Sequence, residues 1–384
     1  MNRIKIMHFI HGLNTGGAET LVKNYMLNFD QKKYDVVLLC LRHEKGSPYE
    51  EKLRKRGIRM VFVQDNLRFD NETIFYKKIM NYFCNYIIVK KTINLEKPDI
   101  LHTHLPINGY IKFARPSKNT IIFHTVHSDP DKLWPKDNKR RMRDFRAVKW
   151  LIAHRNMKLI VLHEGMKNMV DKMFGISNSI VLNNGVDVDS IKSVVNRDVI
   201  REELNIAEEA FVIGHIGRFS KVKNQKFLVD ILSSMERKRK NSFLLMVGDG
   251  PDKNKIMKEL DERGLNGKYL ILSNRQDVPD LFAAMDIFVF PSLYEGLPLS
   301  LIEAQVANKP CFISDKVNQK AVISNLVTSL SIDDNPKKWA DTILDYKKPQ
   351  KIIVNEEDWD IKRITKQLEQ LYMDALMEKN NGKK

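Results

Sequence analysis

Two cations, Arg218 and Lys223, follow the apolar run 211–216. The run is typical of a buried strand, so both cations lie just beyond a strand end. A guanidinium can hold a phosphate group by two parallel hydrogen bonds, and an ammonium adds a compact positive charge. The pair therefore suits a diphosphate. Lys221, in the same turn, is interpreted as a solvated loop residue.

Two carboxylates, Glu295 and Glu303, bracket the start of a predicted helix over 299–306, which follows the apolar strand 287–290. The free N–H groups at a helix start bind anions, and carboxylates accept hydrogen bonds from sugar hydroxyls. The pattern fits a ligand that has both phosphates and sugars. The alternative is structural: Ser300 and Glu303 have the spacing of a capping box, in which Glu303 only closes the helix N-terminus. Helix physics alone does not decide between the two.

Four histidines end two further apolar runs, His102 and His104 on one, His124 and His127 on the next. Carboxyl ends of parallel strands meet at the ligand-binding edge of a sheet. A metal site would need a supporting carboxylate or cysteine, which the sequence does not indicate. Hydrogen bonding to sugar hydroxyls is the preferred interpretation, with packing or capping as the alternative for any single one of them.

A glycine-rich turn, 12–19, joins the first predicted strand to the first helix. It lacks the GxGxxG spacing of dinucleotide-binding proteins. Gly16 and Gly17 still allow a ligand to approach the backbone closely, just before a helix predicted over 19–27. On its own, this turn does not identify the ligand.

Apolar runs alternate with helical stretches along the whole chain, which predicts α/β architecture with doubly wound parallel sheets. The first half contains strands predicted at 4–10, 35–41, 60–63, 100–103, 120–126 and 159–162. The second half contains those at 180–182, 211–216, 243–247, 269–272, 287–290 and 311–313. We expect an N-terminal Rossmann-like domain over 1–185, a second over 186–360, and a C-terminal segment, 361–384, whose helix packs back on the first domain.

The positive charge lies in the first half of the 384-residue chain. The net charge is +16, and residues 1–180 hold 33 Lys and Arg against 17 Asp and Glu, which accounts for all of it. We expect this half to face an anionic membrane surface, with a solvated basic face as the alternative. No nucleic-acid motif is recognisable, so no nucleic-acid partner is expected.

The mean hydropathy is -0.38, no apolar run approaches the length of a membrane-spanning helix, and the N-terminus leads directly into a strand. We therefore expect a cytoplasmic protein that associates peripherally with the inner face of the cell membrane.

The chain resembles the GT-B fold, metal-independent, retaining glycosyltransferases of family 4, especially bacterial members for capsule or exopolysaccharide assembly. The resemblance covers nearly the whole chain. It rests on five motifs in order: Gly16-Gly17-Ala18-Glu19, the strand-end histidines, Asn184-Gly185-Val186-Asp187, Arg218 with Lys223, and Glu295 with Glu303. It implies two Rossmann-like domains with an interdomain cleft.

The resemblance also implies roles for single residues. Arg218 and Lys223 would neutralise the diphosphate of the nucleotide-sugar donor, which would be a UDP-sugar. No metal or other cofactor would then be needed. Glu303 would accept hydrogen bonds from the ribose, while Glu295 and His127 would contact the donor sugar.

The remaining donor-binding positions are those where backbone groups would lie against the phosphates, namely Gly16, Gly17, Gly296, Leu297, Leu299 and Ser300. The acceptor would be a cell-surface polysaccharide or a lipid-linked glycan.

Two positions depart from the family pattern, since Asn274 and Asn308 stand where relatives often have glycine. Asparagine tolerates left-handed backbone better than most residues, so neither change should disturb the fold.

Three other functions remain open at this stage. A nucleotide-sugar 2-epimerase would share the fold but carry further acid/base carboxylates. A non-catalytic glycan- or nucleotide-sugar-binding protein would not need all four of the charged residues Arg218, Lys223, Glu295 and Glu303. A nucleic-acid-binding protein would bind DNA or RNA with a steep salt dependence.

Overall fold

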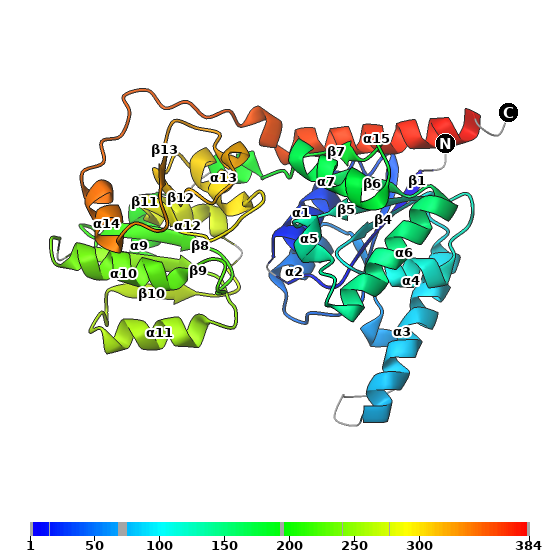
Figure 1. Ribbon diagram of the computed structural model, residues 1–384, viewed down its shortest axis with the longest axis horizontal. Coiled ribbons are helices and arrows are strands. Elements are labelled where there is room, and N and C mark those ends of the chain that lie inside the picture. Colours follow the sequence, from blue (N-terminus) through cyan, green and yellow to red (C-terminus); the bar gives the residue numbers. More distant parts are fainter. Residues whose placement is uncertain are drawn as a thin grey trace. The chain divides into compact units, whose positions relative to one another are not determined.

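The computed structural model describes residues 3–14, 16–67, 75–192, 196–239, 241–275 and 277–381. Thr15 of the glycine-rich turn and residues 382–384 of the C-terminal segment lie outside the described residues. The chain divides into two compact units. Unit 1 comprises Met1–Gly185 and Ile361–Lys384, and unit 2 comprises Val186–Asp360. Figure 1 labels most of their helices and strands.

Unit 1 is built on a parallel sheet, which over the described residues has seven strands in the order β3-β2-β1-β4-β5-β6-β7. The strands are β1 (Ile4–Ile10), β2 (Tyr34–Cys40), β3 (Arg59–Phe62), β4 (Ile100–His104), β5 (Ile121–Val126), β6 (Lys158–Val161) and β7 (Ile180–Val181). All residues of β4 and β5 are buried, as expected of strands covered on both faces.

The helices of unit 1 are α1 (Gly17–Asn28), α2 (Pro48–Lys55), η1 (Gln64–Asn66), α3 (Phe75–Glu96), α4 (Asn108–Ala114), α5 (Pro130–Leu133), α6 (Lys139–Arg155), α7 (Glu164–Phe174) and α15 (Ile361–Asn381). The last of these follows unit 2 in sequence but belongs to the core of unit 1. Its buried residues recur at helical spacing (Ile361, Ile364, Leu368, Tyr372 and Ala375) and pack in one hydrophobic cluster with residues of β1, β4 and α1.

Unit 2 is built on a second parallel sheet, with six strands among its described residues in the order β10-β9-β8-β11-β12-β13. They are β8 (Phe211–Ile216), β9 (Ser242–Val247), β10 (Tyr269–Leu272), β11 (Ile287–Phe290), β12 (Cys311–Ser314) and β13 (Val327–Leu330). Its helices are α8 (Val188–Lys192), α9 (Arg197–Glu203), α10 (Gln225–Glu236), α11 (Lys253–Glu262), α12 (Val278–Ala284), α13 (Leu299–Val306), η2 (Gln319–Ala321), α14 (Pro336–Leu344) and η3 (Glu357–Trp359).

Two strands differ from the expectation. The run at 180–182 was grouped with the strands of the second half, but as β7 it pairs with β6 in the sheet of unit 1, within the first predicted domain, 1–185. β13 was not predicted, because Val-Thr-Ser-Leu is a half-exposed edge strand without an apolar run. Both are short strands at sheet edges, where pairing rather than burial determines the structure.

Both departures from the family pattern lie in left-handed backbone. Asn274 and Asn308 each have a φ of 56°. This conformation suits glycine best, and asparagine is among the few other residues that adopt it readily. The prediction that these substitutions leave the fold intact is confirmed.

Candidate functional site

In unit 2, the loop after β8 carries Arg218 and Lys223, and the loop after β11 carries Glu295. The two strands are neighbours in the sheet. Their loops are hydrogen-bonded to each other: Leu293 N donates to Val222 O at 2.8 Å, and the Asn224 side-chain amide donates to Pro291 O at 3.3 Å. The sheet therefore brings the predicted cations and one predicted carboxylate to the same edge.

Lys223 and Glu295 form an ion pair. Lys223 Nζ lies 2.7 Å from Glu295 Oε1, and the two side chains are only 17% and 15% exposed. The ammonium also lies 4.5 Å from the centre of the Phe290 ring, so an aromatic face supports it from the end of β11. Gly217 leaves room for the lysine, since a Cβ there would lie 3.3 Å from Lys223 Cδ. The ammonium is therefore held in a defined position.

Arg218 is exposed, and its backbone is fixed by the surrounding turns. Its carbonyl accepts a hydrogen bond from Gln225 Nε2 at 3.0 Å. The turn after β9 packs directly on this loop: Gly248 has a φ of 148°, and a Cβ there would lie 2.2 Å from Gly217 O. A glycine is required at position 248 for that contact. The exposed guanidinium can therefore bind a ligand, while the packed turns hold the Arg218 backbone in place.

The start of α13 contradicts the capping-box alternative. The N-cap is Pro298, whose side chain makes no capping hydrogen bond. Ser300 is the second residue of the helix and Glu303 the fifth, so neither can fill its capping-box position. Leu297 and Leu299 are buried, whereas a Cβ at Gly296 would meet nothing within 4 Å. The positive end of the helix dipole therefore begins four residues after Glu295 and is not closed by a serine cap.

In unit 1, β1 and β5 lie on either side of β4, so the glycine-rich turn and His127 share the carboxyl edge of that sheet. Gly16 is the N-cap of α1, and Gly17 is its first residue. A Cβ at Gly17 would meet nothing within 4 Å, whereas one at Gly16 would meet the Glu19 carboxylate at 2.3 Å. Gly17 leaves open space beside the helix start, as a ligand-facing glycine would.

The strand-end histidines are hydrogen-bonded within unit 1. His104 Nδ1 lies 2.9 Å from Nε2 of His127, which is partly exposed, whereas His102, His104 and His124 are fully buried. Burial lowers the pKa of His127 to about 3 and that of His124 to about 4, so both imidazoles are neutral at pH 7.

Two residues in contact with this group were not predicted, His8 of β1 and Tyr372 of α15. His8 Nδ1 lies 2.8 Å from His104 Nε2, and the Tyr372 hydroxyl lies 2.5 Å from His102 Nδ1. His8 occurs within an apolar strand, so its position on the same face as His104 could have been noticed. Tyr372 is 270 residues from His102 in the sequence, and only the packing of α15 brings them together.

Three of these residues have the proximity that a metal site requires. Nitrogens of His8, His102 and His104 lie within 4.8 Å of one another. Their ring nitrogens already have protein partners, namely one another, Tyr372, Thr125 and His127. The geometry is therefore fully explained by hydrogen bonds between neutral groups.

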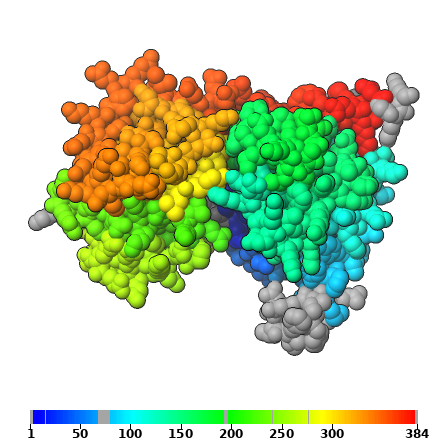
Figure 2. Space-filling model, viewed as in Figure 1, coloured from blue at the N-terminus to red at the C-terminus, as the bar shows by residue number. Residues whose placement is uncertain are grey.

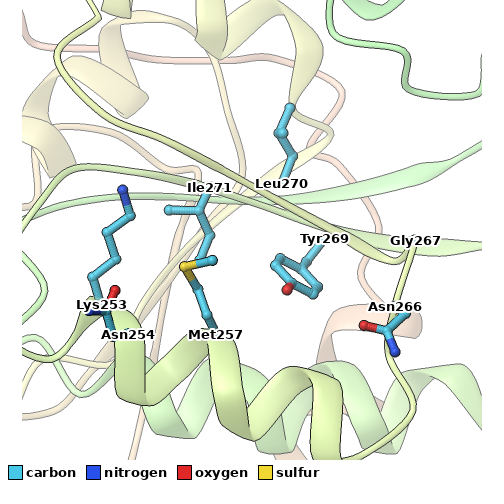
Figure 3. A pocket seen from close by; sticks show the side chains of 8 residues that line it. All are labelled: Lys253, Asn254, Met257, Asn266, Gly267, Tyr269, Leu270 and Ile271. Atoms are coloured by element: carbon cyan, nitrogen blue, oxygen red, sulfur yellow. The ribbon is translucent and has the colours of Figure 1, made fainter.

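A pocket of about 500 Å³ lies elsewhere in unit 2, between α11 and β10 (Figure 3). Its lining residues are Lys253, Asn254, Met257, Asn266, Gly267, Tyr269, Leu270 and Ile271. None of the predicted site residues is among them, so this pocket is separate from the edge that carries Lys223 and Glu295.

Comparison with known proteins decides the family. The profile of "Glycosyl transferases group 1" matches residues 196–360, and that of "Glycosyltransferase Family 4" matches residues 15–190. The chain belongs to the group 1, family 4 glycosyltransferases. It is therefore a transferase enzyme, as the sequence predicted.

Relatives of this glycosyltransferase include enzymes of cell-surface glycan assembly. The chain is 26% identical to an Escherichia coli UDP-Gal:alpha-D-GlcNAc-diphosphoundecaprenol alpha-1,3-galactosyltransferase, over 87% of this chain and 85% of the relative. It is 25% identical to the capsular polysaccharide biosynthesis glycosyltransferase CapH of Staphylococcus aureus, over 96% and 99% of the two chains.

The GT-B fold is confirmed. The crystal structure of Anabaena HepE in complex with UDP and glucose matches with a TM-score of 0.73 at 16% identity, over 96% of this chain and 99% of the other. With both sheets parallel and this structural match, the predicted architecture of the glycosyltransferase is established.

Proposed function

We propose that this glycosyltransferase moves a hexose-type sugar from a UDP-linked donor to a lipid-linked glycan, with retention of anomeric configuration and without a metal ion. The observation that carries the proposal is the edge of unit 2, where Lys223, Glu295 and Arg218 lie together at loops that are bonded to each other. The UDP complex of the HepE structure supports the choice of donor.

The proposed role of the cations follows from where charge develops. When the bond between the sugar and the diphosphate breaks, negative charge grows on the leaving phosphate oxygen. Arg218, Lys223 and the N-terminus of α13 would stabilise that charge, as preorganised donors do in a transition state. They would supply the charge neutralisation that a divalent cation supplies in metal-dependent enzymes.

The carboxylates would recognise hydroxyls. Glu295 has a second oxygen beyond the one that binds Lys223, and it can accept from a hydroxyl of the donor sugar. Glu303 would accept from the ribose, and the amides from Gly296 to Ser300 would bind phosphate. His127 and the backbone at Gly16 and Gly17 would contact the sugar from the edge of unit 1.

The name of the Escherichia coli relative supports a sugar-diphosphoundecaprenol acceptor. The test is to incubate the purified enzyme with UDP-galactose, UDP-glucose and their N-acetyl forms, a GlcNAc-diphospholipid acceptor, and EDTA. We expect acceptor-dependent release of UDP and an α-linked product, measured from the anomeric proton coupling. A β-linked product, or activity lost in EDTA and restored by Mg²⁺ or Mn²⁺, would contradict retention or metal independence respectively.

A surface of unit 1 favours contact with a membrane. We define the α3–α4 surface as Met80, Phe83 and Ile87 on one face of α3, with Phe113 of α4, all between 44% and 63% exposed. The two helices pack together, and α3 lies at the surface of unit 1 in Figure 2. Exposed Lys90 lies 5.7 Å from the Phe113 ring, which places a cation beside the apolar side chains. No helix among the described residues could cross a bilayer.

Apolar side chains with lysines around them are typical of surfaces that insert into the headgroup region of anionic membranes. We expect the protein to sediment with vesicles containing phosphatidylglycerol, and a Phe83→Ser, Ile87→Ser variant to stay in solution. Val199→Ser, which removes an exposed apolar side chain of unit 2, is the matched control. Equal binding to neutral vesicles, or unchanged binding by the double variant, would contradict this surface.

A further inference from the structure

A continuous chain of six polar groups crosses the interior of unit 1. It runs from Thr125 through His102, Tyr372, His8 and His104 to His127. The successive separations are 2.7 Å (Thr125 Oγ1 to His102 Nε2), 2.5 Å (His102 Nδ1 to Tyr372 hydroxyl), 3.2 Å (Tyr372 hydroxyl to His8 Nε2), 2.8 Å (His8 Nδ1 to His104 Nε2) and 2.9 Å (His104 Nδ1 to His127 Nε2). Only the last residue has appreciable exposure.

All six groups are uncharged at neutral pH. Burial lowers the pKa of His8 to about 3 and holds those of His102 and His104 well below the usual value. Burial likewise raises the pKa of Tyr372 well above its usual value. Each group then carries one mobile hydrogen-bonding proton, and each link between neighbours takes one proton.

This proton count leaves two arrangements. If His127 donates from Nε2, then His104, His8 and His102 must also carry their proton on Nε2, and Thr125 accepts at the far end. If Thr125 donates, every one of these imidazoles must carry its proton on Nδ1. A mixed arrangement either places two protons, or none, in one of the links, or has Tyr372 accept from both of its histidine partners and leaves its own buried O–H outside the chain; each of these costs a hydrogen bond.

We propose that these six groups form one proton-ordered chain that forces His8, His102, His104 and His127 into a common tautomer, so that Tyr372 positions the proton of His127. The part about His127 rests on the proposed function. The order of the chain decides whether Nδ1 of His127 offers an N–H or a lone pair to the donor sugar. Tyr372, on a helix contributed by the last part of the chain, is thus a positioning residue and does not itself contact the reacting atoms.

The experiment is a long-range ¹H–¹⁵N correlation spectrum of the full chain labelled at its ten histidines, recorded at pH 7. It reports which ring nitrogen of each imidazole carries the proton. His215 is an internal reference, because its Nδ1 donates to Val289 O at 3.0 Å. We expect the four chain histidines, assigned by single His→Asn variants, to show the same tautomer. Different predominant tautomers among them would overturn the proposal.

Tyr372→Phe breaks the chain with the loss of one oxygen. We expect the tautomer of His102 to become independent of the other three. We also expect the turnover number of sugar transfer to fall about tenfold, the equivalent of one hydrogen bond, with the donor KM unchanged. Tyr25→Phe is the matched control, because Tyr25 is buried beside His8 but is outside the chain. If Tyr372→Phe does not fold, His8→Asn replaces it, since asparagine removes Nε2 and keeps a polar atom near Nδ1.

Unchanged turnover in a folded Tyr372→Phe protein whose tautomers have changed would overturn the positioning role. Unchanged tautomers in that variant would overturn the chain itself. If the wild-type protein transfers no sugar from any UDP-sugar, the proposed function fails, while the tautomer spectra still decide whether the chain exists.

Discussion

The carboxyl edges of the two sheets are built from opposite chemistry. In unit 2, the edge carries charge: Lys223 is paired with Glu295, and Arg218 is exposed beside them. In unit 1, the carboxyl ends of β4 and β5 carry neutral groups: buried imidazoles are bonded to one another and to hydroxyls. Both units have the same doubly wound architecture, so the fold does not dictate this difference.

The difference indicates which part of a ligand each edge suits. Exposed and half-buried cations are strong partners for phosphate oxygens. Neutral donors and acceptors in fixed positions suit hydroxyls, whose recognition depends on direction more than on charge. A nucleotide-sugar contains both kinds of group: the edge of unit 2 suits its phosphates, and the groups of unit 1 suit hydroxyls.

The largest expected effect that separates the two units is acid unfolding. Unit 1 contains five buried histidines whose pKa lies below the value near 6.5 that they regain on unfolding, namely His8, His102, His104, His124 and His127. In the described part of unit 2, one buried histidine, His215, has a pKa lowered in this way. As the pH falls below 6.5, the unfolded state of unit 1 therefore binds more protons than the folded state does. The free energy of unfolding of unit 1 decreases as a result. At pH 5, each such histidine costs roughly 2 kcal/mol.

Five of them together approach the whole stability of an ordinary domain. We expect peptides of β4 and β5 to exchange hydrogen with solvent at about pH 5, while those of β8 and β11 remain protected, as measured by hydrogen-exchange mass spectrometry. Simultaneous loss of protection in both units, or earlier loss in unit 2, would contradict the account of a neutral edge.

The next effect concerns the charged edge. Arg218→Ala and Lys223→Ala each remove a donor that we propose stabilises the leaving diphosphate, and we expect turnover to fall about 100- to 1,000-fold. Lys221→Ala is the control, because it removes an exposed lysine from the same loop. The measurement is the initial rate of UDP release with acceptor present. Equal losses in all three variants would show that general positive charge, rather than the arrangement at the sheet edge, is what matters.

The smallest effect concerns the carboxylate within the charged edge. Glu295→Gln removes the negative partner of Lys223, so UDP should bind about fivefold more tightly. Turnover should nevertheless fall about tenfold, because the hydrogen bond that we propose between Glu295 and the donor sugar is weakened. Asp341→Asn, which breaks the exposed Lys238 pair in the same unit, should change neither quantity. Weaker UDP binding by Glu295→Gln, measured by calorimetry, would contradict the proposed role of the pair.

Much of the fold could be predicted from the sequence, because the central strands are continuous apolar runs. The strands at 4–10, 211–216, 269–272 and 287–290 were predicted with the bounds that the structure has. The edge strand β13 could not be predicted, since it has neither length nor a buried pattern, and the sheet to which the short strand β7 belongs could not be read from its sequence. Their positions depend on pairing partners distant in sequence.

The charged site residues could be proposed from spacing, because Lys223 and Glu295 follow strands that proved to be neighbours. The spacing alone did not reveal that they form an ion pair, nor that the N-cap of α13 is Pro298. Tyr372 could not be predicted as a partner of His102, because its helix offers only an apolar pattern. Its contact with the histidines depends on tertiary packing, which local patterns do not encode.

The most direct test of the central claim is the thermal stabilisation of the wild-type, Lys221→Ala and Lys223→Ala proteins by UDP, GDP, ADP, dTDP and several UDP-sugars. Ligands that bind only the folded state raise the melting temperature, and at a fixed ligand concentration the rise grows with the logarithm of the affinity. We predict that UDP and one UDP-sugar stabilise the wild-type and Lys221→Ala proteins, and that Lys223→Ala loses most of this shift. An equal shift in Lys223→Ala, or none with UDP in the wild-type protein, would contradict the assignment of this edge as the donor diphosphate site.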